Sequence, residues 1–356
     1  MDELAIWFSE IKMSNKNKIM ILNEFGSLEE VYGAVNKKTY FNEKINYAMM
    51  SAYNIERINN IKNKLKSING NIISVYDNKY PSNLKELQDY PPTIYYIGDI
   101  NKINHNKNVA VIGSRKCSYY GEEVTRYIVT ELAKNNINVI SGLAMGIDAI
   151  AHNTAMGCGG FTVGVLGCGI DVIYPIKNKK IFYDMYERGC VISEFPLGTQ
   201  PFKGNFPIRN RIISGLSEMI IVSEATMKSG TLITATHALN QGREVMVVPG
   251  NIFSEFSKGT NMLIKEGANP FLNLQDMVEC IGVDINKENY KKNKICEKYK
   301  GIYEIINDSP IHIDDIIKIT KIDISVLYEL LFEMQFNKMI KCINGNYYIK
   351  NKVDFH

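Results

Sequence analysis

Several common signatures are missing from this sequence, and each absence narrows the class of protein. Its 7 cysteines include no C-x-x-C pair and their number is odd, which argues against a zinc site or a disulfide framework and for reduced, mostly buried thiols. No apolar run approaches the length of a bilayer span. The opening residues MDELAIWFSEIK lack the pattern of a secretory signal. We therefore expect a cytoplasmic protein with no membrane partner and no bound metal.

A strong charge of either sign is missing as well. The 41 Lys and Arg residues nearly balance the 38 Asp and Glu residues, which leaves a formal net charge of +3. Because this charge is too small to make the whole molecule a polycation, any nucleic-acid interface has to be a local basic patch. The composition, 45% hydrophobic and 22% charged, is that of a globular protein. The 356 residues exceed one ordinary core, so we expect two or three domains.

Six short apolar segments alternate with helical ones between about residues 108 and 271. They are rich in Val and Ile, and they begin at Val109, Asn138, Thr162, Cys190, Met219 and Glu244. Their nearly continuous apolar character is typical of strands that are covered on both faces. Their spacing of about thirty residues is typical of βαβ units. The sequence therefore predicts an α/β fold with a Rossmann-like, doubly wound parallel sheet.

The segments on either side of this core predict two smaller domains. Residues 1–70 are helical in pattern, as in a small SAM or helix-hairpin-helix-like domain, and Ser27 with Glu30 predicts a capping box. The Rossmann-like domain then spans 71–282, with its motifs within 109–271. A lysine-rich linker follows over 283–297. Residues 298–356 contain three helical segments and a hairpin signal at Asn344-Gly345, which predicts a winged-helix domain.

Glycine-containing turns after the predicted strands carry the candidate site. In an open parallel sheet, ligands bind beyond the carboxyl ends of the strands, where free backbone N–H groups attract anions. The turns contain neither G-x-G-x-x-G nor a P-loop motif, which argues against a dinucleotide oxidoreductase and a P-loop ATPase. The candidate residues form a basic, glycine-rich rim: Gly113, Ser114, Arg115, Lys203, Phe206, Arg209, Asn210, Arg211, Lys228, Ser229 and Gly230.

Two of these residue types allow a structural as well as a functional role. Arg209 and Arg211 flank Asn210, and guanidinium groups match phosphate in geometry. The same arginines are also able to fix the fold by pairing internally with Glu194, Glu218 or Glu224. Phe202 and Phe206 are candidates for core packing, and because they bracket Lys203 they are also candidates for stacking single-stranded bases.

Asp148 and His152 lie four residues apart on a predicted helix. This spacing is compatible with a metal-binding or acid–base pair. Because no third ligand is near in sequence, we interpret His152 as a hydrogen-bonded structural side chain.

The order and spacing of the turns closely resemble those of the bacterial DNA-processing protein DprA family, also called Smf. Its G-S-R-x-x-S-x-Y-G turn is found at 113–121, and its G-x-A-x-G-I-D-x-x-A-H stretch at 142–152. Its F-P-x-R-N-R-x-I-S-G-L motif is found at 206–216, and its S-G-[ST]-L-I-T-A motif at 229–235.

This resemblance implies a protein that binds single-stranded DNA without sequence preference. Such a protein protects incoming DNA in natural transformation and loads the RecA recombinase onto it, and it is neither an enzyme nor a cofactor-binding protein. The resemblance assigns DNA contacts to Arg115, Lys203 and Phe206. It also implies a homodimer that associates through residues 259–267, with Asn261, Met262 and Ile264 at the interface.

Two other functions compete with this one. The first is a nucleotide-cleaving phosphoribohydrolase of the related lysine-decarboxylase-like superfamily, whose P-G-G-x-G-T-x-x-E motif supplies a glutamate. Thr234 stands at that position here, which removes the acid–base group. The second is a sequence-specific regulator that acts through the winged helix. The third helix of that domain, 322–336, contains Asp323, Glu329 and Glu333 but no Lys or Arg, which disfavours major-groove binding and favours a protein-binding or regulatory role.

Overall fold

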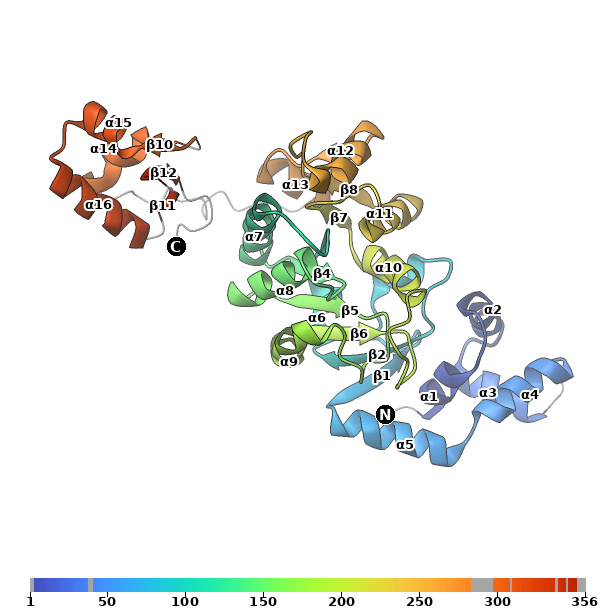
Figure 1. Ribbon diagram of the computed structural model, residues 1–356. Helices are drawn as coiled ribbons and strands as arrows, with labels where there is room; N and C mark the ends of the chain where they lie inside the picture. The colour runs from blue at the N-terminus through green and yellow to red at the C-terminus, as the bar shows by residue number, and fades with distance from the viewer. Residues whose placement is uncertain are drawn as a thin grey trace. The chain divides into compact units, whose positions relative to one another are not determined.

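A nine-stranded sheet forms the centre of the larger part of the molecule (Figure 1). The computed structural model describes residues 3–37, 41–282, 297–307, 309–336, 339–343 and 345–350. Contacts divide the chain into two units, Met1–Asp284 and Ile285–His356, and each is described by itself.

The sheet contains all six strands that the sequence predicts. Its order is β1-β2-β6-β5-β4-β3-β7-β8-β9, in which neighbours from β6 to β9 are parallel. The strands are β1 (Gly70–Ser74), β2 (Thr93–Gly98), β3 (Asn108–Ile112), β4 (Asn138–Ser141), β5 (Thr162–Val165), β6 (Cys190–Ser193), β7 (Met219–Val222), β8 (Glu244–Val247) and β9 (Asn269–Pro270). Every residue of β3 to β7 is buried, which explains why these strands are continuously apolar.

One strand departs from the predicted parallel arrangement. β2 runs antiparallel to both of its neighbours, with Tyr95 opposite Ile72 on β1 and opposite Ser193 on β6. β1 itself was not predicted, because the short segment GNIIS directly follows a helix and lies at the edge of the sheet. The sheet is therefore mixed at this edge and parallel in the rest.

Helices cover both faces of the sheet, as the doubly wound prediction requires. Figure 1 shows α7 (Tyr119–Lys134), α8 (Ile147–Gly157) and α9 (Lys179–Arg188) on one face, and α10 (Asn205–Leu216) and α11 (Gly230–Asn240) on the other. The shorter helices of this unit are α6 (Lys102–His105), α12 (Lys258–Lys265), α13 (Leu274–Ile281), η1 (Ser82–Glu86), η2 (Ile176–Asn178) and η3 (Glu255–Ser257). Among the described residues, no helix has the length and apolarity that crossing a bilayer requires.

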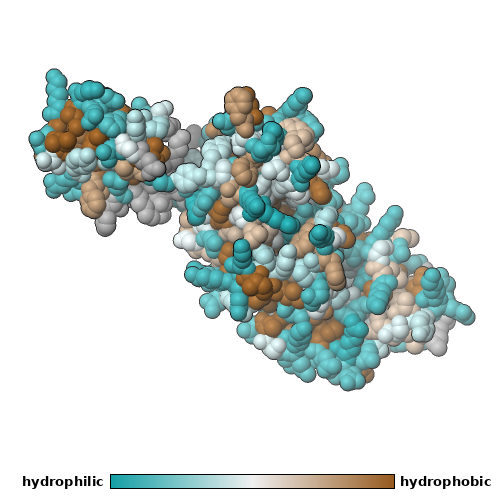
Figure 2. Space-filling view, in the orientation of Figure 1, coloured by the Kyte–Doolittle hydropathy of each residue, from teal (hydrophilic) through white to brown (hydrophobic). Residues whose placement is uncertain are grey.

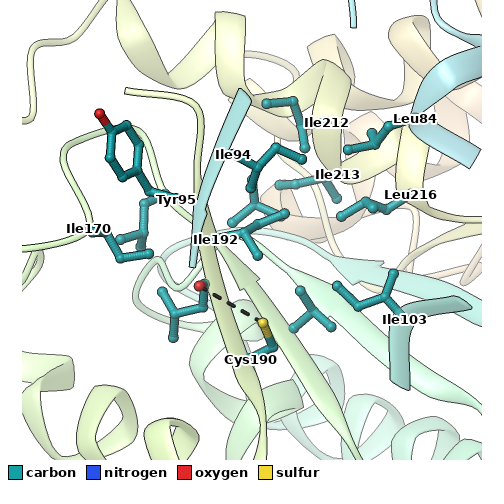
Figure 3. Close-up of a cluster of buried hydrophobic side chains, with 14 of the residues drawn as sticks. Leu84, Ile94, Tyr95, Ile103, Ile170, Cys190, Ile192, Ile212, Ile213 and Leu216 are labelled. Carbon is teal, nitrogen blue, oxygen red and sulfur yellow. Dashed lines mark hydrogen bonds between the residues drawn. The ribbon is translucent and has the colours of Figure 1, made fainter. Parts of the chain in front are cut away.

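The position of α10 is fixed by apolar contacts. Figure 3 shows Ile212, Ile213 and Leu216 of this helix beside Ile94 and Ile192 from the sheet. All five side chains are almost completely buried, and burying such a side chain contributes about 1.5–3 kcal/mol. The packing of α10 therefore also fixes the direction of its first turn, which carries Phe206.

The surface is mixed in character, since hydrophilic residues surround small hydrophobic patches on the face in Figure 2.

The N-terminal helices share the core of the sheet, although the sequence predicts a domain boundary at residue 70. They are α1 (Glu3–Glu10), α2 (Asn15–Phe25), α3 (Leu28–Lys37), α4 (Glu43–Ala52) and α5 (Ile55–Ser67). Trp7 is fully buried and donates to the Met49 carbonyl oxygen at 2.8 Å. The hydroxyl groups of Ser9 on α1 and Tyr95 on β2 lie 2.6 Å apart. Helices and sheet therefore belong to one packed unit.

The second unit contains the elements of the predicted winged helix. Its helices are α14 (Glu297–Ile305), α15 (Ile313–Thr320) and α16 (Ile324–Phe336), and its sheet has the order β10-β12-β11. The strands are β10 (Ile311–His312), β11 (Ile340–Ile343) and β12 (Tyr347–Lys350). The winged-helix assignment stays a prediction. Apart from Glu297, the predicted linker lies outside the described residues, as do Asn344 of the predicted turn and residues 351–356.

The cysteines are less buried than the sequence suggested. All six in the described part of the chain are free thiols, but Cys158, Cys280 and Cys342 are exposed. Two of the exposed thiols lie at or near helix ends, Cys158 as the residue that ends α8 and Cys280 in the last turn of α13. A side chain at such a helix end does not have to pack in the core. The expectation of mostly buried thiols is therefore wrong.

Candidate nucleic-acid interface

The turn after β3 presents Arg115 to solvent. Ser114 is buried, and its backbone N–H donates to the Glu224 carbonyl oxygen at 2.8 Å. Its own carbonyl oxygen accepts from the Ile147 N–H at 3.2 Å. Gly113 has no room for a side chain, because a Cβ there would lie 2.6 Å from Ile147. These contacts hold the turn in one conformation and leave the Arg115 side chain exposed.

A buried carboxylate supports this turn from below. Glu224 is 2% exposed, and its Oε2 accepts from the Ser118 N–H at 2.8 Å. The Ser118 hydroxyl also donates to Glu224 and accepts from the Gly121 N–H, which caps α7. Glu224 is therefore used in fixing the start of α7, and it does not pair with Arg209 or Arg211.

Phe206 lies at the centre of a group of cations and aromatic rings. Its ring centroid is 5.7 Å from Arg115 Cζ and 5.7 Å from the centroid of the Tyr174 ring, which is tilted by 38°. Gly167 makes room for the ring, since a Cβ there would lie 2.8 Å from it. Cation–π attraction acts over such distances. We call Arg115, Tyr174 and Phe206 the Phe206 cluster.

Two further cations stand at the same edge of the sheet, which we call the carboxyl edge because β3 to β8 end there. Lys203 lies in the connection between β6 and α10, and Lys228 in the connection between β7 and α11. Both are exposed, and neither takes part in an ion pair within the described residues. Ser229 caps α11 by accepting from the Thr231 N–H at 3.2 Å, and the position of Gly230 is open.

Arg209 lies inside the protein and not on the surface. It is 5% exposed, and its Nη1 donates to the carbonyl oxygens of Gly142, at 2.8 Å, and of Val165. Burial lowers the pKa of Arg209 to about 10, and Asp148 opposes this shift. Asp148 in turn accepts from the Gly142 N–H at 3.1 Å, and burial raises the pKa of its carboxyl group. Arg209 therefore joins the loop after β4 to the end of β5 from inside the protein.

Arg211 is also internal. Its Nε lies 3.2 Å from Asp89 Oδ2, and its Nη2 donates to Glu194. Glu194 Oε2 also accepts from Asn15 Nδ2 at 2.9 Å, and burial raises the pKa of the Glu194 carboxyl group. Glu194 is one of the three glutamates that the sequence offered as internal partners of Arg209 and Arg211.

These contacts correct the candidate surface. Arg209 and Arg211 were candidates for contact with an external anion, but their guanidinium groups bond to protein groups: Arg209 to carbonyl oxygens, and Arg211 to the buried Glu194 and the exposed Asp89. Asn210 lies between them, half-buried, with Oδ1 accepting from Arg209 Nε at 3.2 Å. We leave all three residues out of the surface proposed below.

His152 has the structural role expected for it. Its Nδ1 lies 2.7 Å from Thr162 Oγ1, and the Thr162 hydroxyl donates to the Val139 carbonyl oxygen. The ring nitrogen Nδ1 therefore carries the proton, because the Thr162 oxygen can only accept from it. Burial lowers the pKa of His152 to about 3. Within the described ranges, no three His, Cys, Asp or Glu side chains gather as a metal site would require.

The predicted self-association segment lies on α12. Asn261 Oδ1 accepts from the Gly250 N–H at 3.1 Å, and its Nδ2 donates to the Gly250 carbonyl oxygen at 3.0 Å. This residue therefore holds the turn after β8. Met262 and Ile264 are half-buried. Their role in a dimer stays a prediction.

Tyr174 is the member of the Phe206 cluster that sequence reasoning missed. It is 41% exposed and follows β5 in the turn GCGIDVIYP. The available signal was an aromatic residue in a turn at the carboxyl edge, but nothing in the sequence placed it next to Phe206, 32 positions away.

Thr234 stands where the hydrolases of the alternative function carry their glutamate, and its side chain is buried within α11.

The fold and the edge together define a Rossmann-like protein with a candidate anion-binding surface. A family model described as DNA recombination-mediator protein A matches residues 71–282. The chain therefore belongs to this family, which confirms the resemblance to DprA and Smf.

Individual relatives agree with this assignment. The chain is 42% identical over 205 residues to DNA processing protein DprA of Streptococcus pneumoniae, covering 58% of this chain and 72% of that protein. It is also 42% identical to Protein Smf of Escherichia coli over 205 residues, covering 57% of this chain and 54% of that protein.

Two solved structures are similar as well. The X-ray structure of DprA from S. pneumoniae has a TM-score of 0.69 and 32% identity, over 78% of this chain and 98% of that one. A structure of DprA from Helicobacter pylori has a TM-score of 0.54 and 31% identity, over 58% of this chain and 94% of that one. The latter structure is described as showing a single-stranded DNA binding mode.

Proposed function

We propose that this protein binds single-stranded DNA along its carboxyl edge, without sequence preference. The observation that carries the proposal is the Phe206 cluster, in which the exposed Arg115 guanidinium and the Tyr174 ring each lie 5.7 Å from the centre of the Phe206 ring. Bases of any kind stack on aromatic faces, and a guanidinium group contacts phosphate. The cluster thus offers both interactions that a single strand requires.

The charges at the edge support the same ligand. Arg115, Lys203 and Lys228 are exposed, whereas the carboxylates of Asp148 and Glu224 are buried. A polyanion at this edge therefore contacts the exposed cations, whereas the two carboxylates lie buried and already have hydrogen-bond donors of the protein as partners. Because counterion release and stacking carry no base code, binding should be sensitive to salt and tolerant of sequence.

The relatives support a proposal for the biological role. The family is described by recombination mediation, and the H. pylori relative by single-stranded DNA binding. We propose that this protein protects single-stranded DNA in the cytoplasm and loads the RecA recombinase onto it during transformation and recombination. It does so as a homodimer joined through α12, and it has no catalytic activity of its own.

The second unit has a different role in this proposal. Helix α16 contains no Lys or Arg and exposes Ile324, Tyr328 and Phe332. Because a helix in the major groove needs cations and hydrogen-bond donors, we assign to this unit a protein contact or a regulatory role.

Fluorescence anisotropy of a labelled single-stranded oligonucleotide tests the proposal. We expect tight binding at low salt that duplex competitor displaces poorly. Arg115→Ala should weaken binding and lower the slope of log affinity against log salt by about 0.7, the value for one phosphate contact on a single strand.

Lys107→Ala is the matched control, because Lys107 is exposed but precedes β3 at the opposite edge. It should bind like the wild type. No binding by the wild type at low salt would contradict the proposal. Nucleotide cleavage that disappears in Arg115→Ala would revive the hydrolase alternative.

A further inference from the structure

A second basic and aromatic surface adjoins the Phe206 cluster. After β5 the chain passes through Tyr174 and η2 into the first turns of α9. The exposed side chains of this stretch are aliphatic, aromatic or cationic: Tyr174, Ile176, Lys177, Lys179, Lys180 and Tyr183. We call Lys177, Lys179, Lys180 and Tyr183 the α9 patch.

The positive charge of this patch is not neutralised within the described chain. None of its three lysines forms an ion pair there, and Lys179 Nζ lies 5.7 Å from the centroid of the Tyr183 ring. The nearest acidic residues in sequence have other partners: Asp171 pairs with Lys64, and Asp184 pairs with Arg188 at 3.6 Å.

Packing does not explain these lysines. The first turn of α9 has no acidic residue, and cations at a helix start are disfavoured by the helix dipole. The side chains are exposed and add nothing to the core. A surface that keeps three unpaired cations in this position is suited to an external anion.

The patch begins three residues after Tyr174, which belongs to the Phe206 cluster. The Tyr174 and Phe206 rings are in contact, with centroids 5.7 Å apart. Because α9 leads from β5 to the parallel strand β6, its first turn lies at the carboxyl edge, where Arg115 and Lys203 also stand. An extended polyanion on the Phe206 cluster therefore meets the α9 patch next on one side.

We propose that the α9 patch extends the binding path, so that a single strand leaving the Phe206 cluster crosses Tyr174 and reaches the α9 patch. In this path Tyr183 stacks a base, and the three lysines contact successive phosphates. The inference rests on the proposed function and adds a second contact region that only a longer strand reaches.

A length series of oligothymidylates tests this path in the full-length chain. We compare strands of about 4 and about 20 nucleotides, which bracket the site sizes of single-strand-binding surfaces. For the long strand, Lys177→Ala/Lys179→Ala/Lys180→Ala should lower the salt slope by about 2, which corresponds to three phosphate contacts. Tyr183→Ala should weaken the same complex about fivefold or more. For the short strand, both variants should bind like the wild type.

Control variants separate this path from general charge effects. Lys107→Ala and Tyr47→Ala remove an exposed lysine and an exposed tyrosine far from the carboxyl edge in the fold. Neither variant should change the affinity for the short strand or for the long strand. Lys177→Arg/Lys179→Arg/Lys180→Arg keeps the charge and should restore the salt slope, which also shows that the fold is intact.

Three outcomes would overturn the inference: unchanged long-strand binding in the alanine variants, equal weakening of short and long strands, or no rescue by arginine. In each of these the wild type still binds and Arg115→Ala still weakens it. Failure of the wild type to bind either strand would instead overturn the proposed function.

Discussion

The same edge of the sheet contains exposed cations and buried cations, and the two sets do different work. Arg115 and Lys203 are exposed, whereas Arg209 and Arg211 are each 5% exposed and bonded to carbonyl oxygens or carboxylates of the protein. All four are among the candidate residues of the basic rim that the sequence predicts. Burial decides which of them are available to an external anion and which hold the loops that present the others.

The largest effect should come from the buried set. Arg209→Ala leaves Asp148 buried without its cationic neighbour and removes the donor that joins the loop after β4 to the end of β5. Removing a buried donor costs about 1–3 kcal/mol for each carbonyl oxygen that is left without a partner, and here there are two, on Gly142 and Val165. We expect a decrease of this size in the free energy of unfolding, measured by urea titration at pH 7. Lys203→Ala, from the exposed set, should leave the same quantity unchanged, and equal stability of the two variants would remove the distinction drawn above.

Acid should reveal the buried histidine that lies near Arg209. Burial lowers the pKa of His152 to about 3 from its usual 6.5, so the unfolded chain takes up a proton that the folded protein refuses. This contribution to stability is complete above about pH 6.5 and is lost as the pH falls from there toward 3, by about 1.4 kcal/mol per pH unit. NMR titration of the His152 ring measures this directly. A ring that titrates near pH 6.5 in the folded protein would contradict the buried, neutral assignment.

The half-buried Phe206 ring, which lies beside the exposed Arg115, should affect binding more than stability. Phe206→Ala removes the ring on which Arg115 and Tyr174 converge. A stacked base is worth about 1–3 kcal/mol, and we expect this loss of binding free energy for single-stranded DNA by anisotropy. Phe202→Ala is a suitable comparison, because Phe202 is 64% exposed and lies close by in sequence. If the Phe202 variant loses more affinity than the Phe206 variant, the centre of the interface has been misplaced.

The smallest effect should be that of a single phosphate contact. Lys203→Ala should reduce the slope of log affinity against log salt by about 0.7. The measurement is a salt series at constant pH with a long oligothymidylate. Arg211→Lys serves as the counterpart from the buried set, since a lysine keeps the charge, and any loss there should appear in unfolding and not in the salt slope.

The sequence predicts features that depend on neighbouring residues, such as the central strands. It does not predict the role of a side chain whose partners are distant in sequence. The six central strands are continuously apolar because both faces are covered, and this pattern is visible in any one segment. The role of Arg211 depends on Asp89, Glu194 and Asn15, which are distant in sequence. Tyr174 became part of the site only because the β5 turn brings it to Phe206. The DNA contacts themselves stay predictions, since they concern a molecule outside the chain.

The bond from Asn15 to Glu194 changes what counts as a domain in this protein. The family match begins at residue 71, yet Glu194 on the β6 side of the sheet has partners on both α10 and the N-terminal helix α2. A fragment that starts at the family boundary would lose Asn15 and would also uncover Tyr95, whose hydroxyl contacts Ser9. The family model therefore covers a smaller part of the chain than the packed unit Met1–Asp284, and the N-terminal helices act as part of the frame on which the carboxyl edge is built.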